Sequence, residues 1–291
     1  MGGGVKEAPI VSFSRDGEVF QLGRGPEDPV LHLYGSKGLG APPVSIASSD
    51  RLAGDGAIVR GVRYGVRDVF IPLYMEAASS GDLSLMRRSL TALLAPHLGP
   101  VEVRVQDPAT GSDRMIRGLL KDGLDGDFGD GFHGSWQTLG LIFECADPWW
   151  SGPEQTVELR INPGRKPFIS TTVPFFPVTL AQSTVMGAFQ VDVQGAGPVS
   201  PAWEVVGPGE DLLISNGRAV IEIGGAFPAG STVLIDTATG RITPDRWSTV
   251  SLRSRLCQLD PGPQTLTVTL TGATTDTLVR LTYRERYLEG I

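Results

Sequence analysis

The chain has 291 residues, enough for two ordinary domains that each bury a core of their own. Its 38 Gly and 22 Pro make up about a fifth of the sequence, which together with 41% hydrophobic residues favours a turn-rich β protein over a disordered chain. The formal net charge of -7 disfavours stable binding of nucleic acid, because a protein that holds phosphates needs a surplus of Lys and Arg.

Strands dominate the first of two expected domains, which we place at residues 1–152. A strand at residues 10–13 is followed by a Gly- and Pro-rich loop at residues 26–43, of a kind that often makes contacts. Residues 58–64 and 66–73 are predicted strands, and the second is partly apolar on both faces. That pattern indicates a sheet that is covered on both sides.

One amphipathic helix is predicted in this domain. Its apolar side chains recur every three or four residues, at Leu83, Met86, Leu90, Leu93 and Leu94. Asp82 is the expected N-cap, and Pro96 ends the helix because proline lacks a backbone N–H. We expect the helix to lie with one face on a sheet and the other face outward.

A hairpin is predicted after the helix. Residues 101–106 alternate between Val and polar side chains, which predicts a strand. The turn at residues 107–111 contains Pro and Gly, and residues 114–120 form the return strand. Residues 139–145 alternate in the same way, and the motif Asp147-Pro148-Trp149-Trp150 ends the domain.

A Pro-rich connector separates the two expected domains. Five prolines occur from Pro153 to Pro177, a density typical of extended segments and edge strands. We therefore place the connector at residues 153–177.

The second domain, at residues 178–291, is predicted to be a β-sandwich that needs no helix. Short strands alternate with turn signals, of which Asn216-Gly217 is the sharpest. Residues 236–240 mark another turn. The last strand, at residues 278–283, continues into a tail at residues 284–291, and whether this tail runs back to pair with the first domain stays open.

No catalytic motif occurs in the sequence. His32, His97 and His133 lie far apart without the H-E-x-x-H pattern, and no serine lies in a G-x-S-x-G motif. Cys145 and Cys257 lack a Cys–His signature and are expected to be buried, reduced thiols. We therefore assign no catalytic, cofactor-binding or metal-binding residue and expect that the protein is not an enzyme. A triad assembled from distant residues stays an alternative.

Two segments have a ligand-binding interpretation and a simpler one. Residues 35–40 are Gly-rich, but they lack the G-K-[ST] ending of a phosphate loop and are interpreted as a contact loop. Trp149 and Trp150 would point to opposite sides of a strand. Packing of these tryptophans is therefore favoured over a flat platform for sugars.

The acidic loop at residues 122–134 is the candidate for calcium. It carries four side chains with oxygen ligands, Asp122, Asp125, Asp127 and Asp130. The spacing does not match an EF-hand, because Trp136 occupies the position of the bidentate Glu. A solvated loop is the preferred interpretation, and calcium binding stays open.

No signal for export, lipidation or membrane insertion is found. Residues 1–10 lack the apolar stretch of a signal peptide, and Lys6 stands where a myristoylation motif has Ser or Thr. Apolar runs such as residues 139–143 are far shorter than the roughly 20 residues of a membrane span. We expect synthesis in the cytoplasm and no membrane insertion.

Several segments, taken in this order, resemble the distal tail protein family of siphoviruses. In the first domain they are the loop at residues 34–43, Gly61-Val62-Arg63-Tyr64-Gly65-Val66-Arg67-Asp68-Val69, the helix ending at Pro96, and Asp147-Pro148-Trp149-Trp150. In the second domain they are Phe176-Pro177, Gly197-Pro198-Val199-Ser200-Pro201, Ile235-Asp236, Leu259-Asp260-Pro261-Gly262 and Leu281-Thr282-Tyr283-Arg284-Glu285-Arg286-Tyr287. The order of these segments carries the resemblance, which covers nearly the whole chain.

The resemblance implies a mostly β protein of two domains: an N-terminal β-rich domain with one α-helix that forms a hexameric ring, and a C-terminal galectin-like β-sandwich. It implies a structural virion protein at the phage tail tip, which connects the tail tube to the tail tip or baseplate and lets DNA pass. The implied partners are further copies of the chain, the tail tube protein, the tail-associated hub protein of the tip, and receptor-binding proteins. No cofactor is implied.

Two other functions are weighed against this one. A carbohydrate-binding tail module that contacts the host surface is the alternative, but it needs an exposed aromatic platform, and the sequence shows no obvious one. A cell-wall hydrolase needs paired carboxylates or a metal site, and no such pairing is recognisable.

Overall fold

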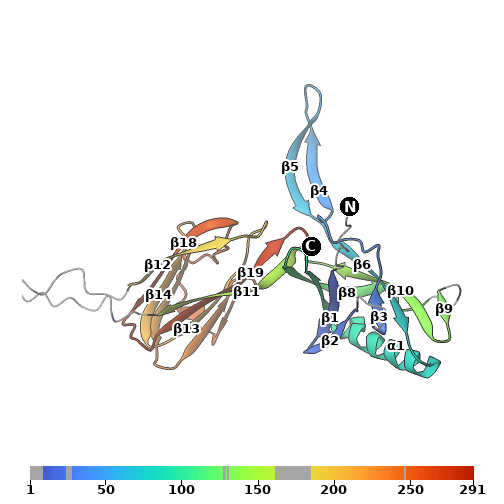
Figure 1. The fold of residues 1–291 in the computed structure, drawn as a ribbon. Helices are drawn as coiled ribbons and strands as arrows, with labels where there is room; N and C mark the ends of the chain where they lie inside the picture. Colours follow the sequence, from blue (N-terminus) through green and yellow to red (C-terminus); the bar gives the residue numbers. More distant parts are fainter. Residues whose placement is uncertain (1–8, 24–27, 127–128, 130, 161–184, 246) are drawn as a thin grey trace, which may run out of the picture. The chain divides into compact units, whose positions relative to one another are not determined.

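The computed structural model describes residues 9–23, 28–126, 129, 131–160, 185–245 and 247–291 (Figure 1). The chain divides into two compact units. The first unit comprises Met1–Pro153 together with Tyr287–Ile291, and the second comprises Glu154–Arg286. Both units are built mainly of strands, and the described residues form one α-helix, which confirms the predicted fold class.

Antiparallel strands form the main sheet of the first unit. In spatial order they are β2 (Glu18–Gln21), β1 (Ile10–Arg15), β7 (Val101–Asp107), β8 (Ser112–Asp122), β10 (Trp136–Cys145), β6 (Arg67–Glu76) and β3 (Val30–His32). A short strand, β9 (Phe132–His133), pairs with the start of β10. The predicted loop at residues 26–43 is therefore not wholly a loop, because β3 lies within it and pairs with β6.

The hairpin of β7 and β8 follows from the alternation of its side chains. The three valines of β7 are buried, and Arg104 on the opposite face forms a salt bridge with Asp113 of β8. In the turn, Gly111 has a φ of 72°, and the amide of Ala109 donates to Asp107 Oδ1 at 3.0 Å. The predicted hairpin is confirmed.

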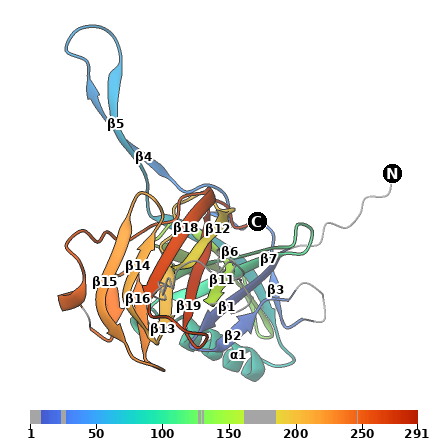
Figure 2. The ribbon, with the colours of Figure 1, turned by 90° about the vertical axis from the view of Figure 1, so that its left-hand side faces the viewer.

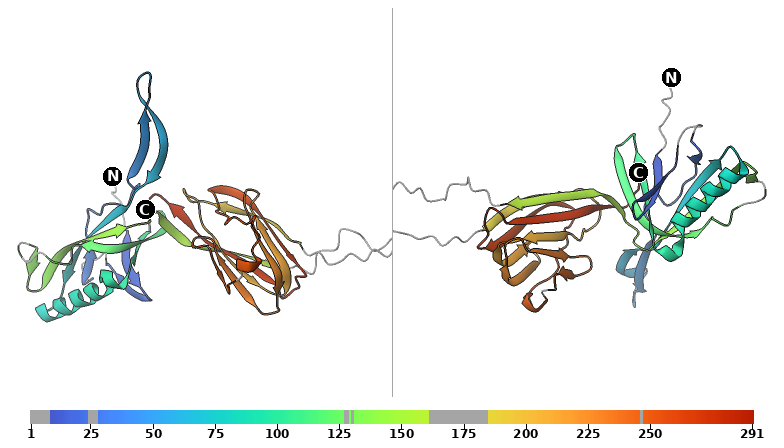
Figure 3. Two further views of the ribbon diagram at one scale, coloured as in Figure 1. Left: turned by 180° about the vertical axis from the view of Figure 1, so that it is seen from behind. Right: turned by 90° about the horizontal axis from the view of Figure 1, so that it is seen from below.

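Helix α1 (Ser80–Leu94) contributes buried leucines to the core of the first unit, as its apolar spacing predicts. Its start differs from the prediction: the N-cap is Ser79 and not Asp82. Ser79 has an extended backbone, and its hydroxyl accepts a hydrogen bond from the Asp82 amide at 3.1 Å. The helix ends at Leu94, shortly before Pro96, as predicted. Figure 3 shows α1 from two further directions.

A separate sheet of two strands, β4 (Val44–Asp50) and β5 (Ala57–Tyr64), projects from the rest of the first unit (Figures 1 and 2). Among the described strands these two pair only with each other. We call residues 44–64 the arm. The sequence predicts β5, at residues 58–64, but it does not predict β4.

The second unit is a β-sandwich of two antiparallel sheets. One sheet has the order β17 (Arg241–Thr243), β16 (Thr232–Asp236), β13 (Ala202–Val206), β19 (Leu278–Tyr287) and β11 (Trp150–Arg160). The other has the order β12 (Val185–Val193), β18 (Gly262–Thr271), β14 (Gly209–Ser215) and β15 (Val220–Phe227). Side chains from both sheets form one buried cluster, which includes Trp203 and Leu266.

The two predicted turns of the second unit are confirmed. Asn216-Gly217 joins β14 to β15, and residues 236–240 join β16 to β17. Gly217 has a φ of 81°, and Asn216 Oδ1 accepts a hydrogen bond from the Arg218 amide at 3.0 Å. Both features are typical of a tight hairpin turn.

Strands β11 and β19 each begin in one unit and end in the other. Strand β11 extends to Arg160, so residues 153–160 of the expected connector form a strand. The rest of the connector lies in residues 161–177, outside the described residues. The domain limits at 152 and 178 stay a prediction.

Candidate assembly surface

The arm is exposed along its whole length. Nearly every residue of both strands is exposed, and the exposed fraction is 61% at Ile46 and 63% at Val62. Leu52, near the tip, is fully exposed. The arm therefore buries almost no apolar area of its own.

The strand register gives the arm one apolar side. Residues that pair directly across an antiparallel ladder point to the same side of the sheet. The pairs and their alternation place five large apolar side chains on one side, which we call the apolar face: Val44, Ile46, Val59, Val62 and Tyr64. The opposite side carries mostly small or polar side chains, Ser45, Ala47, Ser49 and Arg63, together with Ile58.

A β-bulge at Arg60 keeps the apolar face continuous. The ladder passes from Gly61 to Val59 on β5 while β4 advances by one residue, so Arg60 is the extra residue. Without this extra residue, Val59 would point to the opposite side, because side chains alternate along a strand. The Arg60 side chain donates from Nε to Ser49 Oγ at 2.9 Å.

The arm joins the rest of the first unit through a packed root. The rings of Tyr64 and Trp149 meet edge to face with centroids 5.2 Å apart, and the amide of Gly65 donates to the carbonyl of Pro43 at 2.8 Å. Trp150 is fully buried. These two tryptophans therefore pack, as predicted, and offer no flat platform for a sugar.

A two-stranded sheet with an exposed apolar face is marginally stable in water. Contiguous exposed apolar side chains and unpaired strand edges are typical of surfaces that pair with another chain. The arm is the strongest candidate assembly surface in the part of the chain that the structure describes.

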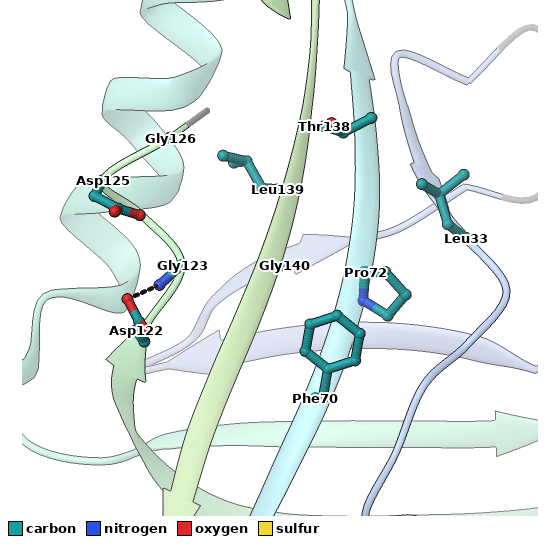
Figure 4. Close-up of a pocket in the computed structure, with 10 residues that line it drawn as sticks. All are labelled: Leu33, Phe70, Pro72, Asp122, Gly123, Asp125, Gly126, Thr138, Leu139 and Gly140. Atoms are coloured by element: carbon teal, nitrogen blue, oxygen red, sulfur yellow. Dashed lines mark hydrogen bonds between the residues drawn. The ribbon is translucent and has the colours of Figure 1, made fainter. Parts of the chain in front are cut away.

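The acidic loop borders an open pocket of about 560 Å³ in the first unit (Figure 4). Asp122 and Asp125 lie on one side, and apolar side chains of β6 lie opposite. Asp122 Oδ1 accepts a hydrogen bond from the Gly123 amide at 2.8 Å. Asp127 and Asp130 lie outside the described residues. Among the described residues, no group of three or more His, Cys, Asp and Glu could hold a metal ion.

The three histidines lie on different elements: His32 on β3, His97 after α1 and His133 on β9. His32 Nε2 lies 2.7 Å from Ser36 Oγ. Burial lowers the pKa of the His32 imidazole, and the backbone of Pro9 partly offsets this effect. A neutral imidazole beside a hydroxyl supplies the base and the nucleophile of a catalytic triad. No carboxylate among the described residues hydrogen-bonds to Nδ1 of His32, so the third member is missing there.

Cys145 and Cys257 are both buried and unbridged, as predicted. Burial raises the pKa of the Cys145 thiol to about 12 and also raises the pKa of the Cys257 thiol. A thiol becomes nucleophilic only as the thiolate. Both cysteines are therefore inert packing residues at neutral pH.

One face of the second unit carries a small ion-pair network. Arg280 of β19 forms salt bridges with Glu158 of β11 and Glu204 of β13. The hydrogen bond between Arg280 and Glu158 raises the pKa of Arg280 and lowers the pKa of Glu158. Arg280 and Glu204 border a groove of about 640 Å³ with the half-exposed Leu234. Trp203, which also borders it, is 1% exposed and presents no face on which a sugar could stack.

Residues 194–287 match the family model of the siphovirus-type tail component, C-terminal domain. The match covers about a third of the chain. No curated protein matches the chain.

Solved structures resemble this chain over nearly its whole length. The Dit protein of phage SPP1, described as a paradigm of the hub adsorption apparatus in phages that infect Gram-positive bacteria, is 16% identical, with a TM-score of 0.64 over 95% of this chain and 98% of that one. Two structures of the phage P2 baseplate in its activated conformation, with Ca and with Sr, contain chains that are 10% identical. Their TM-scores are 0.57 and 0.56, over 96% and 94% of this chain and 98% of theirs. These likenesses establish a Dit-like fold.

The resemblance to distal tail proteins drawn from the sequence is confirmed by the family match and the Dit-like fold. The described part of the chain contains no helix that is long and apolar enough to cross a membrane. The sequence did not reveal the apolar face of the arm. The signal that could have found it is the alternation of Val44 and Ile46 opposite that of Val62 and Tyr64.

Proposed function

We propose that this tail component is a hub protein that forms a homo-hexameric ring between the tail tube and the tail tip of the virion. The apolar face of the arm carries the proposal, because a neighbouring copy would bury it. A closed ring requires that one surface of each subunit complements a different surface of the next. The arm is such a surface, and we assign ring formation to the first unit.

The ring has a structural role and lets DNA pass. Like charges repel, so a chain with a net charge of -7 favours passage of DNA over its retention. The partners are the tail tube protein, the tail-associated hub protein of the tip, and receptor-binding proteins. No catalytic activity is assigned, since the Ser36–His32 pair has no third member among the described residues.

Mass photometry of the full chain tests the ring and the arm together. Wild type should form rings, at high concentration or with tail partners present, whereas the double variant Ile46→Asp, Val62→Asp should remain monomeric. The matched control is the double variant Ser45→Asp, Ala47→Asp, which places two carboxylates on the opposite side of β4 and should leave the rings intact. Persistent wild-type monomers in the presence of tail partners would refute the ring. Rings formed by the double variant Ile46→Asp, Val62→Asp would show that the arm is not part of the interface between copies.

The carbohydrate-binding alternative has less support. The groove beside Arg280 is lined by charged and aliphatic side chains and two threonines, and its one tryptophan is buried. Binding to a glycan array that a single exposed aromatic substitution abolishes would favour that alternative over the scaffold.

A further inference from the structure

Arg67 is a buried cation at the root of the arm. It is the first residue of β6, and its side chain is 1% exposed. Its Nη1 donates to the carbonyls of Gly38 and Gly40 at 2.9 and 2.7 Å, and its Nη2 donates to the carbonyl of Leu288 at 2.7 Å. The guanidinium carbon lies 5.9 Å from the centroid of the Trp150 ring.

These bonds connect three segments through one guanidinium. Gly38 and Gly40 precede the arm, Arg67 follows it, and Leu288 comes from the last residues of the chain. Burial lowers the pKa of Arg67, which reflects the cost of keeping the charge away from water. A buried polar group that loses a partner is left unsatisfied, so each carbonyl that Arg67 holds is difficult to release.

The segment Tyr287–Ile291 fits its surroundings at two further points. Its tyrosine ring lies beneath the guanidinium of Arg114, with 3.4 Å between the guanidinium carbon and the ring centroid. The amide of Gly290 donates to the carbonyl of Leu39 at 2.7 Å. Position 290 is also sterically closed, since a Cβ there would lie 2.7 Å from the buried indole of Trp150.

We propose that Tyr287–Ile291 acts as an internal ligand of the first unit and fixes the root of the arm. Its seat is formed by Arg67, Leu39, Trp150 and Arg114, and the glycine at position 290 is what allows the segment to enter. The contacts of this segment lie within a single chain and do not depend on the proposed function. Only an effect of the segment on ring formation rests on that function. When the segment leaves, Arg67 loses one of its three carbonyls and the loop before the arm loses the hydrogen bond at Leu39.

Hydrogen exchange of the full chain, followed by mass spectrometry, tests the seat. Gly290→Val should accelerate exchange about tenfold or more in peptides that contain Lys37 and Gly65, whose amides are hydrogen-bonded at the root. The matched control is Glu289→Ala, which changes an exposed neighbour in the same segment and should leave these rates unchanged. Arg67→Met added to Gly290→Val should raise the rates by less than the two single effects combined, because both changes break the same contact network.

A second variant covers the case in which Gly290→Val does not fold. A chain that ends at Tyr287 lacks residues 288–291, and with them the hydrogen bonds to Arg67 and Leu39, without introducing a steric clash. It should show the same faster exchange at the root. Unchanged exchange in either folded variant overturns the inference, whether or not rings form. Absence of rings in wild type would instead refute the proposed function and leave the exchange result standing.

Discussion

In the arm and in β18, apolar and polar side chains alternate along antiparallel strands. The two regions differ in what covers the apolar side. In β18 the side chains of Leu266, Val268 and Leu270 are fully buried inside the sandwich. In the arm, Ile46 and Val62 are more than 60% exposed. Alternation determines which side chains share a face, but it does not determine whether the same chain covers that face. An exposed apolar face on an extended hairpin is therefore informative about partners, whereas a buried one is informative about the fold.

The largest difference is expected when the same substitution, Val→Asp, is made in β18 and in the arm. Val268→Asp places a carboxylate in the sandwich core and should lower the free energy of unfolding of the second unit by about 4 kcal/mol or more, or prevent its folding. Val62→Asp adds the same charge to the apolar face of the arm and should change the free energy of unfolding by less than about 0.5 kcal/mol. Urea denaturation followed by circular dichroism measures both.

Equal losses of stability in these two variants would contradict the comparison. They would mean that the apolar face of the arm is covered within the single chain, and the arm would then no longer be a candidate assembly surface.

Helix α1 is intermediate between the buried β18 and the exposed arm. Its apolar stripe is covered by strands of its own unit, while its N-terminal turn is exposed. Ser79→Ala should lower the free energy of unfolding by about 1 kcal/mol, since it removes the hydroxyl that accepts from the Asp82 amide. The exposed Ser89, whose hydroxyl lies in the middle of the helix, provides the control, and Ser89→Ala should be neutral or slightly stabilising. Thermal unfolding of both variants measures the difference. A larger loss in Ser89→Ala than in Ser79→Ala would refute Ser79 as the N-cap.

The sequence predicted the elements whose signals are local. Asn216-Gly217 defines its hairpin within four residues, and the alternation of residues 101–106 defines β7 in the same way. Strand β4 was missed because Val44 and Ile46 are its only large apolar residues and two prolines precede them. The apolar face depends on a cross-strand register and a bulge, which no single segment encodes.

The seat of Tyr287–Ile291 could not be predicted for a different reason. Its contacts join residues that lie more than 200 positions apart in the chain, as the bond from Arg67 to Leu288 does. A glycine near the end of a chain has many explanations in a sequence, and only the buried indole beside Gly290 distinguishes among them.

The smallest expected effect comes from comparing one carboxylate of the β7–β8 hairpin, Asp113, with one carboxylate of the arm, Asp50. The hydrogen bond from Arg104 lowers the pKa of Asp113, so this carboxylate stabilises the folded chain at pH values above its unfolded pKa of about 3.9. That contribution is lost as the pH falls through the lower, folded pKa. Asp113→Asn should therefore lower the free energy of unfolding by at most about 1 kcal/mol at pH 7, because the pair is partly exposed, and the difference from wild type should vanish near pH 2. Asp50→Asn on the arm is the control and should leave the free energy of unfolding unchanged at pH 7, since Asp50 is exposed. Urea titrations at pH 7, 4 and 2 measure both variants. A difference for Asp113→Asn that grows toward pH 2 would contradict a lowered pKa of Asp113 in the folded chain.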